Sequence, residues 1–173
     1  MNGAEPVNYR TLVDFGSIYK AHGFKMDYFL PVYGLAEATL AACFPRPGDA
    51  VRYEVVDRQE LANGRSVLAS GKGSMAVVSV GRKVPGHEIL IVDEEGCELE
   101  EREVGHIVVA GDSVMQGYYG DPTATAKVVS DGWLWTGDLG YQADDNLFVT
   151  GRAKDLIIVR GRNIYAEDIE RIA

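Results

Sequence analysis

The chain has 173 residues, with 17 lysines and arginines against 26 aspartates and glutamates, which gives a net charge of -9. This length suits one domain with a sizeable core or parts of two, and the acidic balance argues against a nucleic-acid or anionic-membrane surface. No apolar run approaches the roughly 20 residues of a membrane span, and the N-terminus lacks a signal-peptide pattern. We therefore expect a cytoplasmic protein with no nucleic-acid partner and no membrane span.

The two cysteines, Cys43 and Cys97, lie far apart and have no Cys or His neighbour at metal-ligand spacing. A zinc site is therefore not expected, and a disulfide in a reducing compartment is expected even less. We interpret both as small apolar residues.

The first 45 residues indicate a mixture of helix and strand. Residues 1–6 are typical of a loop. Apolar residues then recur at helical spacing over 9–22, and Gly23 follows as a stop. An apolar run over 28–32 predicts a short buried strand.

Residues 33–40 read YGLAEATL. Tyr33 and Gly34 form the turn that ends the strand, and the following helix formers place Glu37 in a first turn, where the helix dipole favours a carboxylate. From these residues alone, Tyr33 is as well explained as a core aromatic residue and Glu37 as a residue that supports a helix start.

Residues 46–72 are charged, interrupted by proline and glycine, and lack a clean period. They predict a surface excursion with a short strand and one helical turn over 57–62. The apolar residues of this segment are numerous enough to dock it on the protein body. They are Tyr53, Val55, Val56, Leu61, Val67 and Leu68.

The remainder is rich in expected strands. Apolar runs near 75–80, 88–92, 106–110 and 147–149 are separated by glycine-containing turns, so they predict a small and mostly antiparallel β-subdomain. A brief helix is expected over 123–129. Residues 156–159 predict a further strand, and a helix is expected to start at Asp168, where acidic residues suit a first turn.

Two short motifs point to a ligand. Thr136-Gly137-Asp138 places a carboxylate on a turn after an aromatic strand, where it can accept hydrogen bonds from two neighbouring hydroxyls such as those of a ribose. Arg152 leaves the next strand at Gly151 and can hold the same ligand with its fixed fork of donors. A sugar-and-phosphate ligand fits the pair, although each residue alone is well explained by a turn or a surface ion pair.

YGLAEATL, TGDLG and GRAKDLIIVRGRN, in this order, resemble the adenylate-forming enzymes and, among them, the fatty acyl-AMP ligases. The resemblance implies that Asp138 and Arg152 bind the ribose hydroxyls of ATP. It also implies that Lys154, two residues after that arginine, is a hinge.

The same resemblance implies a role for residues near the N-terminus. Tyr33 stacks on adenine, with Gly34 beside it in the nucleotide site, and Glu37 is a catalytic residue that ligates the Mg²⁺ bridging the ATP phosphates. Many relatives carry Thr where this chain has Ala36. A GAEP-like segment lines the adenine pocket in this family, which assigns the residues Gly3, Ala4 and Glu5 to the site.

By this resemblance the fold is α/β, or mixed α+β. Residues 1–150 are the end of the large N-terminal adenylation domain, with an α/β portion over 1–45, an insertion over 46–72 and the β-subdomain over 73–150. Residues 151–173 are the hinge and the first hairpin of the C-terminal domain. The implied cofactors are ATP and Mg²⁺, and the implied partners are a fatty acid and an acyl carrier protein or CoA as thiol acceptor.

The insertion favours a fatty acyl-AMP ligase, and a fatty acid-CoA ligase and a non-catalytic module with the AMP-binding fold are the alternatives. A helix that starts at Asp168 has no partner against which to bury Ile169 and Ile172, and no glycine-rich phosphate loop is present. Both features suggest a fragment that is inactive alone.

Overall fold

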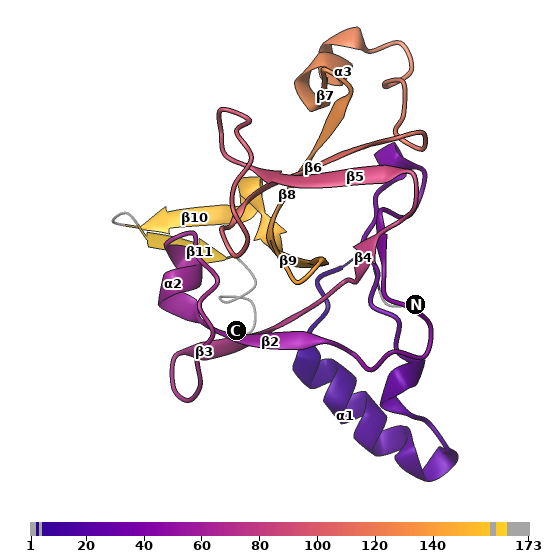
Figure 1. Ribbon diagram of the computed structural model, residues 1–173, viewed down its shortest axis with the longest axis vertical. Coiled ribbons are helices and arrows are strands. Elements are labelled where there is room, and N and C mark those ends of the chain that lie inside the picture. The colour runs from indigo at the N-terminus through magenta and orange to yellow at the C-terminus, as the bar shows by residue number, and fades with distance from the viewer. Residues whose placement is uncertain (1–2, 4, 160–161, 166–173) are drawn as a thin grey trace.

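The computed structural model describes residues 3, 5–159 and 162–165 as a mixed α/β fold in which the strands are mostly antiparallel (Figure 1). No helix in this described part of the chain is long and apolar enough to cross a membrane. The helices are α1 (Tyr9–Tyr19), α2 (Arg58–Ala62) and α3 (Pro122–Val128), and the 3-10 turns are η1 (Lys20–His22), η2 (Met26–Tyr28), η3 (Ala36–Ala38) and η4 (Ala153–Asp155). The strands are β1 (Cys43–Phe44), β2 (Tyr53–Asp57), β3 (Ser74–Val78), β4 (Arg82–Lys83), β5 (His87–Val92), β6 (Gly105–Gly111), β7 (Val129–Ser130), β8 (Trp133–Ala143), β9 (Asn146–Arg152), β10 (Leu156–Val159) and β11 (Arg162–Tyr165).

The largest sheet has five strands, with β5, β6, β8 and β7 in that order and β9 paired to β8. The pairs β1–β4, β2–β3 and β10–β11 are antiparallel as well. Strand β9 of the large sheet lies beside the β2–β3 pair (Figure 1), and Ser79, directly after β3, bridges to Phe148 of β9. The amide of Val80 also donates to the carbonyl of Leu147 at 2.9 Å. The predicted antiparallel β-subdomain is therefore confirmed.

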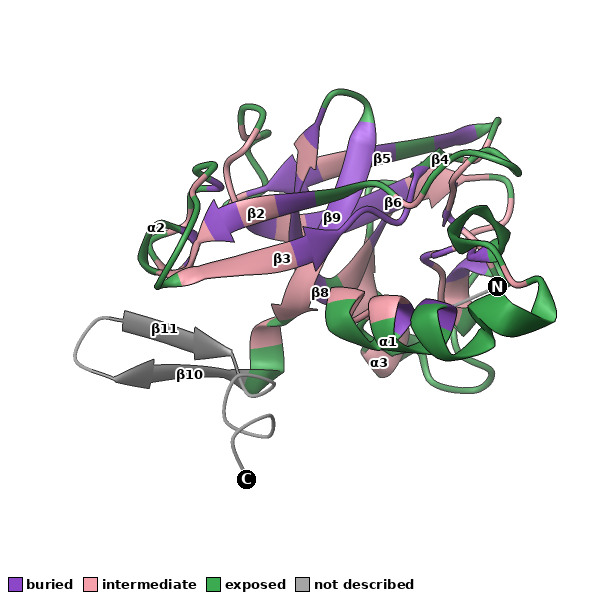
Figure 2. Ribbon diagram, turned by 90° about the horizontal axis from the view of Figure 1, so that it is seen from below, coloured by how far each residue is buried: buried purple, intermediate pink, exposed green. Residues whose placement is uncertain are grey.

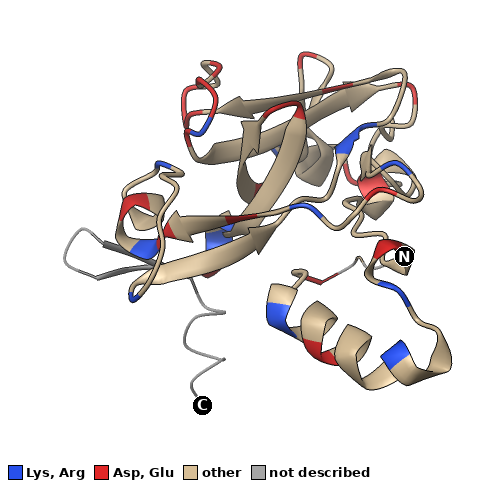
Figure 3. Cartoon of the chain, turned by 60° about the horizontal axis from the view of Figure 1, so that its bottom comes forward, with Lys and Arg blue, Asp and Glu red and all other residues tan. Residues whose placement is uncertain are grey.

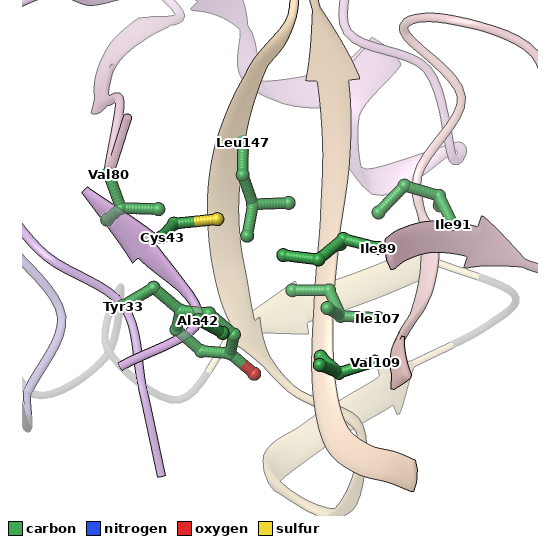
Figure 4. Close-up of a cluster of buried hydrophobic side chains, with 9 residues drawn as sticks. All are labelled: Tyr33, Ala42, Cys43, Val80, Ile89, Ile91, Ile107, Val109 and Leu147. Carbon is green, nitrogen blue, oxygen red and sulfur yellow. The ribbon is translucent and has the colours of Figure 1, made fainter. Parts of the chain in front are cut away.

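Buried side chains are concentrated on the strands, whereas most of α1 is exposed (Figure 2). Charged residues lie mainly in loops, turns and helices (Figure 3), as expected for strands that face a common core. One core cluster lies between β1, β5, β6 and β9 (Figure 4) and consists of Tyr33, Ala42, Cys43, Val80, Ile89, Ile91, Ile107, Val109 and Leu147.

The predicted helix over 9–22 is confirmed as α1 followed by η1. Asn8 caps it by accepting a hydrogen bond from the amide of Arg10 at 2.9 Å, and Gly23 ends it with a φ of 84°. Leu12 is the buried member of the predicted apolar face, while Phe15 and Ile18 are 41% and 68% exposed.

Two predictions for residues 28–40 are wrong. Residues 28–32 do not form a strand: Phe29 is extended, but Pro31 has no amide hydrogen to donate to a ladder, and η2 occupies the start of the run. The predicted helix over 35–40 is reduced to η3, because the chain leaves helical geometry at Thr39, whose φ is 68°.

Residues 46–72 contain the expected strand and helical turn, as β2 and α2. Asp57 caps α2 by accepting from the amide of Gln59 at 2.8 Å. The segment is more than a surface excursion, because Val56 and Leu61 are fully buried in a second core cluster. Leu68 is 60% exposed and does not contribute to that docking.

The predicted strand over 156–159 is confirmed as β10, which forms a hairpin with β11. Helix α2 contacts β11, so the segment before the large sheet meets the hairpin after it. The helix expected from Asp168 lies outside the described residues. The domain boundaries given above stay predictions.

Candidate functional site

Thr136-Gly137-Asp138 is a bulge inside strand β8, not the turn that the sequence predicted. Trp135 pairs with Val108 of β6 and Leu139 pairs with His106, so three β8 residues lie opposite one residue of β6. Gly137 has a φ of +77°, which glycine adopts without strain. A bulge re-aims side chains locally, and here it sets the direction of Asp138.

The carboxylate of Asp138 is held by two side chains from other elements. The Tyr33 hydroxyl donates to Oδ2 at 2.7 Å, and Arg152 Nε lies 3.2 Å from Oδ1. Asp138 and Arg152 are register partners in β8 and β9, which explains why residues 14 positions apart meet. Asp138 and Arg152, which the sequence assigned to one ligand, thus form a direct ion pair, and Tyr33 joins them.

Thr136 stabilises the bulge from inside the strand, a role that the sequence did not predict. Its hydroxyl donates to the Ile107 carbonyl at 2.9 Å and accepts from the Asp138 amide at 3.1 Å. The Thr136 hydroxyl therefore fixes the backbone that carries the carboxylate. The only sequence signal was a hydroxyl residue two positions before Asp138.

Tyr33 is 8% exposed, and its ring packs beside Ala42 with the hydroxyl directed away from Cys43 and Val80 (Figure 4). Burial raises the pKa of the Tyr33 hydroxyl far above its ordinary value, and the negative charge of Asp138 raises it further. The phenol consequently stays protonated and serves as a donor to Asp138. A ligand ring can reach only the margin of this side chain.

The lone pairs of Asp138 are only partly used. A carboxylate offers about four acceptor positions, and Tyr33 and Arg152 take one on each oxygen. About two acceptor positions remain, which matches two vicinal hydroxyls of a sugar. The Arg152 side chain is 59% exposed and engages Asp138 through Nε, and a guanidinium carries further N–H donors.

Glu37 lies on η3 and is half-buried. The Tyr118 hydroxyl donates to its Oε1 at 2.8 Å, and the Met115 amide donates to its carbonyl at 2.7 Å. Neither contact was predicted from the sequence. Among the described residues, no three His, Cys, Asp or Glu residues gather as a metal site. Glu37 nevertheless suits Mg²⁺, which proteins commonly bind through one or two carboxylates together with substrate phosphates.

The other predicted site residues are placed as follows. A side chain at Gly34 would meet the Leu40 carbonyl oxygen at 1.7 Å, so its backbone packs too closely for any other residue. Gly3 lies against Val32, directly before Tyr33. Glu5 is exposed, Ala4 lies outside the described residues, and Lys154 is exposed in η4, two residues after Arg152.

A family model described as "AMP-binding enzyme" matches residues 2–119 of this chain. One similar solved structure comes from a study of fatty acyl-adenylate ligases from E. coli and L. pneumophila. It is 43% identical with a TM-score of 0.92, and the match covers 98% of this chain and 31% of that one.

A second solved structure, the fatty acyl-adenylate ligase from L. pneumophila in complex with acyl adenylate and pyrophosphate, is 36% identical with a TM-score of 0.82. That match covers 89% of this chain and 28% of the other. The medium-chain-fatty-acid--[acyl-carrier-protein] ligase JamA of Moorena producens is 36% identical over 98% of this chain and 31% of its own length. The chain thus spans about a third of the length of its curated relatives.

Proposed function

Because this chain belongs to the AMP-binding enzyme family, we propose that it supplies the nucleotide-holding part of an ATP-dependent fatty acyl ligase. The reaction joins the carboxylate of a fatty acid to the AMP portion of ATP and releases pyrophosphate. The acyl group then passes to a thiol. The names of the similar ligases support this substrate class.

The observation that carries the proposal is the geometry around Asp138. A nearly buried carboxylate, held on each oxygen by one donor, retains acceptors for two hydroxyls. We assign these acceptors to the ribose of ATP, and the free N–H groups of Arg152 to the same sugar. Tyr33 would then contact the base with its exposed margin, beside Gly34.

The remaining predicted residues complete the proposed site. Glu37 would provide one carboxylate oxygen to the Mg²⁺ that accompanies the ATP phosphates, a cation that prefers oxygen ligands. The backbone from Gly3 to Glu5 would border the adenine. Lys154 would be the hinge and would not touch the nucleotide.

For the thiol acceptor we propose a carrier protein, with CoA as the second candidate. Similar proteins carry names of both kinds. The observation that favours a carrier protein is the contact of α2 with β11, since a docked β2–α2 segment against this hairpin would limit how far the chain after the hinge can rotate. Comparing acyl transfer to CoA and to a carrier protein by the full-length polypeptide distinguishes the two.

The nucleotide assignment is tested with Asp138→Ala in the full-length polypeptide that carries this sequence. Two charge-assisted hydrogen bonds are lost, each worth about 1.5–3 kcal/mol, so the affinity for ATP should fall more than tenfold. The sharper measurement compares ATP with ATP lacking both ribose hydroxyls, by calorimetry. The unaltered protein should prefer ATP strongly, and the variant should bind the two nucleotides alike.

Tyr33→Phe is the matched control, because it removes one donor to Asp138 and keeps the carboxylate. It should retain most of the preference for the ribose hydroxyls. If Asp138→Ala discriminates the two nucleotides as well as the unaltered protein does, Asp138 is a structural residue of the bulge and the proposed site is wrong.

A further inference from the structure

The loop between β6 and α3 is hydrogen-bonded to the short turn that carries Glu37. Ser113 Oγ donates to the Ala38 carbonyl at 3.1 Å, and the Thr39 hydroxyl donates to the Ser113 carbonyl at 2.9 Å. The Met115 amide donates to the Glu37 carbonyl. Three successive residues of one turn are therefore each bonded to the same loop.

The turn that carries Glu37 has an unusual backbone conformation at Thr39. Thr39 has a φ of 68°, a value that a β-branched residue rarely adopts. Such a conformation persists only where the surroundings enforce it, and it commonly marks a functional site. The hydrogen bonds of Ser113 with Ala38 and with Thr39 itself provide that enforcement.

The same loop reaches the carboxylate itself through Tyr118, whose hydroxyl donates to Glu37 Oε1 at 2.8 Å. The backbone of Tyr118 is fixed from the opposite side, because its amide donates to Thr125 Oγ1 of α3 at 2.9 Å. Gly117 lets the loop approach, since a Cβ there would lie 2.7 Å from Thr125 Cγ2. A chain of contacts thus runs from α3 through Tyr118 to Glu37.

We infer that Tyr118 is a positioning residue for Glu37: its hydroxyl engages Oε1 and leaves Oε2 directed to the cation that accompanies the nucleotide phosphates. This inference rests on the proposed function of Glu37. A carboxylate with one oxygen fixed by a phenol has fewer orientations to lose when it ligates a metal. Partners that orient a ligand in this way commonly matter 10-fold to 100-fold for metal affinity.

The test uses Tyr118→Phe in the full-length polypeptide that carries this sequence, with Tyr119→Phe as the matched control because Tyr119 is fully exposed at 105%. ATP affinity is measured by calorimetry in Mg²⁺ and in EDTA. Tyr118→Phe should lose about tenfold of the affinity that Mg²⁺ adds and should bind metal-free ATP normally. Tyr119→Phe should match the unaltered protein in both buffers.

Glu37→Gln, alone and combined with Tyr118→Phe, separates the inference from the proposal beneath it. If Tyr118 acts through Glu37, adding Tyr118→Phe to Glu37→Gln has no further effect on the Mg²⁺ dependence. If Glu37→Gln weakens the Mg²⁺ dependence and Tyr118→Phe does not, the positioning role is wrong and the proposed metal ligand stands. If neither substitution alters it, the role proposed for Glu37 fails first and the inference falls with it.

Discussion

The buried residues Tyr33 and Cys43 differ in how the free-energy cost of burying a polar group is compensated. Tyr33 has a charged partner, and its hydroxyl donates to Asp138 at 2.7 Å. Cys43 lies in the same cluster, and burial alone raises the pKa of its thiol from an ordinary value of about 9 to about 12. Burial therefore keeps the Cys43 thiol neutral, whereas the Tyr33 hydroxyl donates a hydrogen bond to Asp138.

The raised pKa of Cys43 predicts how stability depends on alkaline pH. The unfolded chain releases this proton near pH 9 and the folded chain retains it until about pH 12, so the stabilisation is complete below pH 9 and is lost as pH rises toward 12. Each pH unit in this window lowers the free energy of unfolding by about 1.4 kcal/mol. Between pH 9 and 10 the free energy of unfolding should fall about 1 kcal/mol less in Cys43→Ala than in the unaltered chain.

Urea unfolding at a series of pH values measures this slope. Cys97→Ala is the matched control, because Cys97 is exposed, and it should keep the slope of the unaltered chain. Above pH 10 the buried phenols of Tyr33 and Tyr141 add to the decline, since burial raises both pKa values as well. An unchanged slope in Cys43→Ala would contradict the prediction.

The sequence was sufficient to group Asp138 with Arg152 as candidates for one ligand, because a glycine-bearing motif and the strand spacing are local signals. It did not reveal how the two meet, since a bulge depends on register with β6, which is distant in the chain. The contact of Tyr118 with Glu37 joins residues 81 positions apart and leaves no periodic trace in the sequence. Side-chain partners across such separations come from packing alone.

At the level of elements, the stop signal at Gly23 predicted a helix end correctly, whereas an isolated apolar run did not predict a strand. Gly23 ends its helix as expected, because cap preferences act within a few residues. The run over 28–32 was apolar because Phe29 belongs to a core cluster with Leu12, not because it joins a sheet. Short apolar runs do not by themselves separate strands from irregular core segments.

The β2–α2 segment is held in the fold by a partly buried charge pair. Arg102 donates through Nη1 and Nη2 to Glu54 at 3.0 and 2.9 Å, and the Tyr141 hydroxyl donates to the same carboxylate at 3.2 Å. The Ser66 amide donates to the Arg102 carbonyl at 2.7 Å. Together with buried Val56, these contacts make β2–α2 an integral part of the core, so deleting residues 51–69 should unfold the chain.

Arg102→Met should therefore destabilise the chain by about 2–3 kcal/mol, because it leaves the carboxylate of Glu54, 9% exposed, without its cation. The value lies below that of a fully buried pair because the Arg102 side chain is 32% exposed. Thermal or urea unfolding measures it. Adding Glu54→Gln should recover part of the loss by removing the unpaired charge.

Arg52→Met is the matched control, since Arg52 pairs with Asp144 where both side chains are largely exposed, at 40% and 67%. Its cost should stay below about 1 kcal/mol. Equal costs at Arg102 and Arg52 would mean that the bidentate pair does not hold the segment.

At the scale of the whole molecule, segments far apart in the chain meet at the carboxylate of Asp138. Tyr33 precedes the β-rich part, Asp138 lies in the middle of β8, and Arg152 ends β9 immediately before η4. The β10–β11 hairpin follows within a few residues. A rotation that begins in η4 would therefore move the hairpin while Arg152 stays in the sheet with Asp138.

Lys154→Pro tests that arrangement. Proline fixes φ near -65° and disfavours helical geometry in the residue before it, so it acts on Ala153 within η4 as well as on Lys154 itself. In the full-length polypeptide that carries this sequence, a hinge restricted in this way should impair one half-reaction at least tenfold more than the other, because a few residues absorb the φ/ψ change of a domain rotation. Acyl-adenylate formation and transfer to the thiol are assayed separately.

Lys154→Ala is the matched control, because it removes the exposed ammonium and leaves the backbone free. If Lys154 acts through backbone geometry, this variant should retain both half-reactions while Lys154→Pro loses one. If Lys154→Ala and Lys154→Pro lose the same half-reaction equally, the side chain is a ligand and the hinge assignment is wrong. Equal loss of both half-reactions in Lys154→Pro, with a lowered melting temperature, would instead indicate damage to the end of β9, where Arg152 pairs with Asp138.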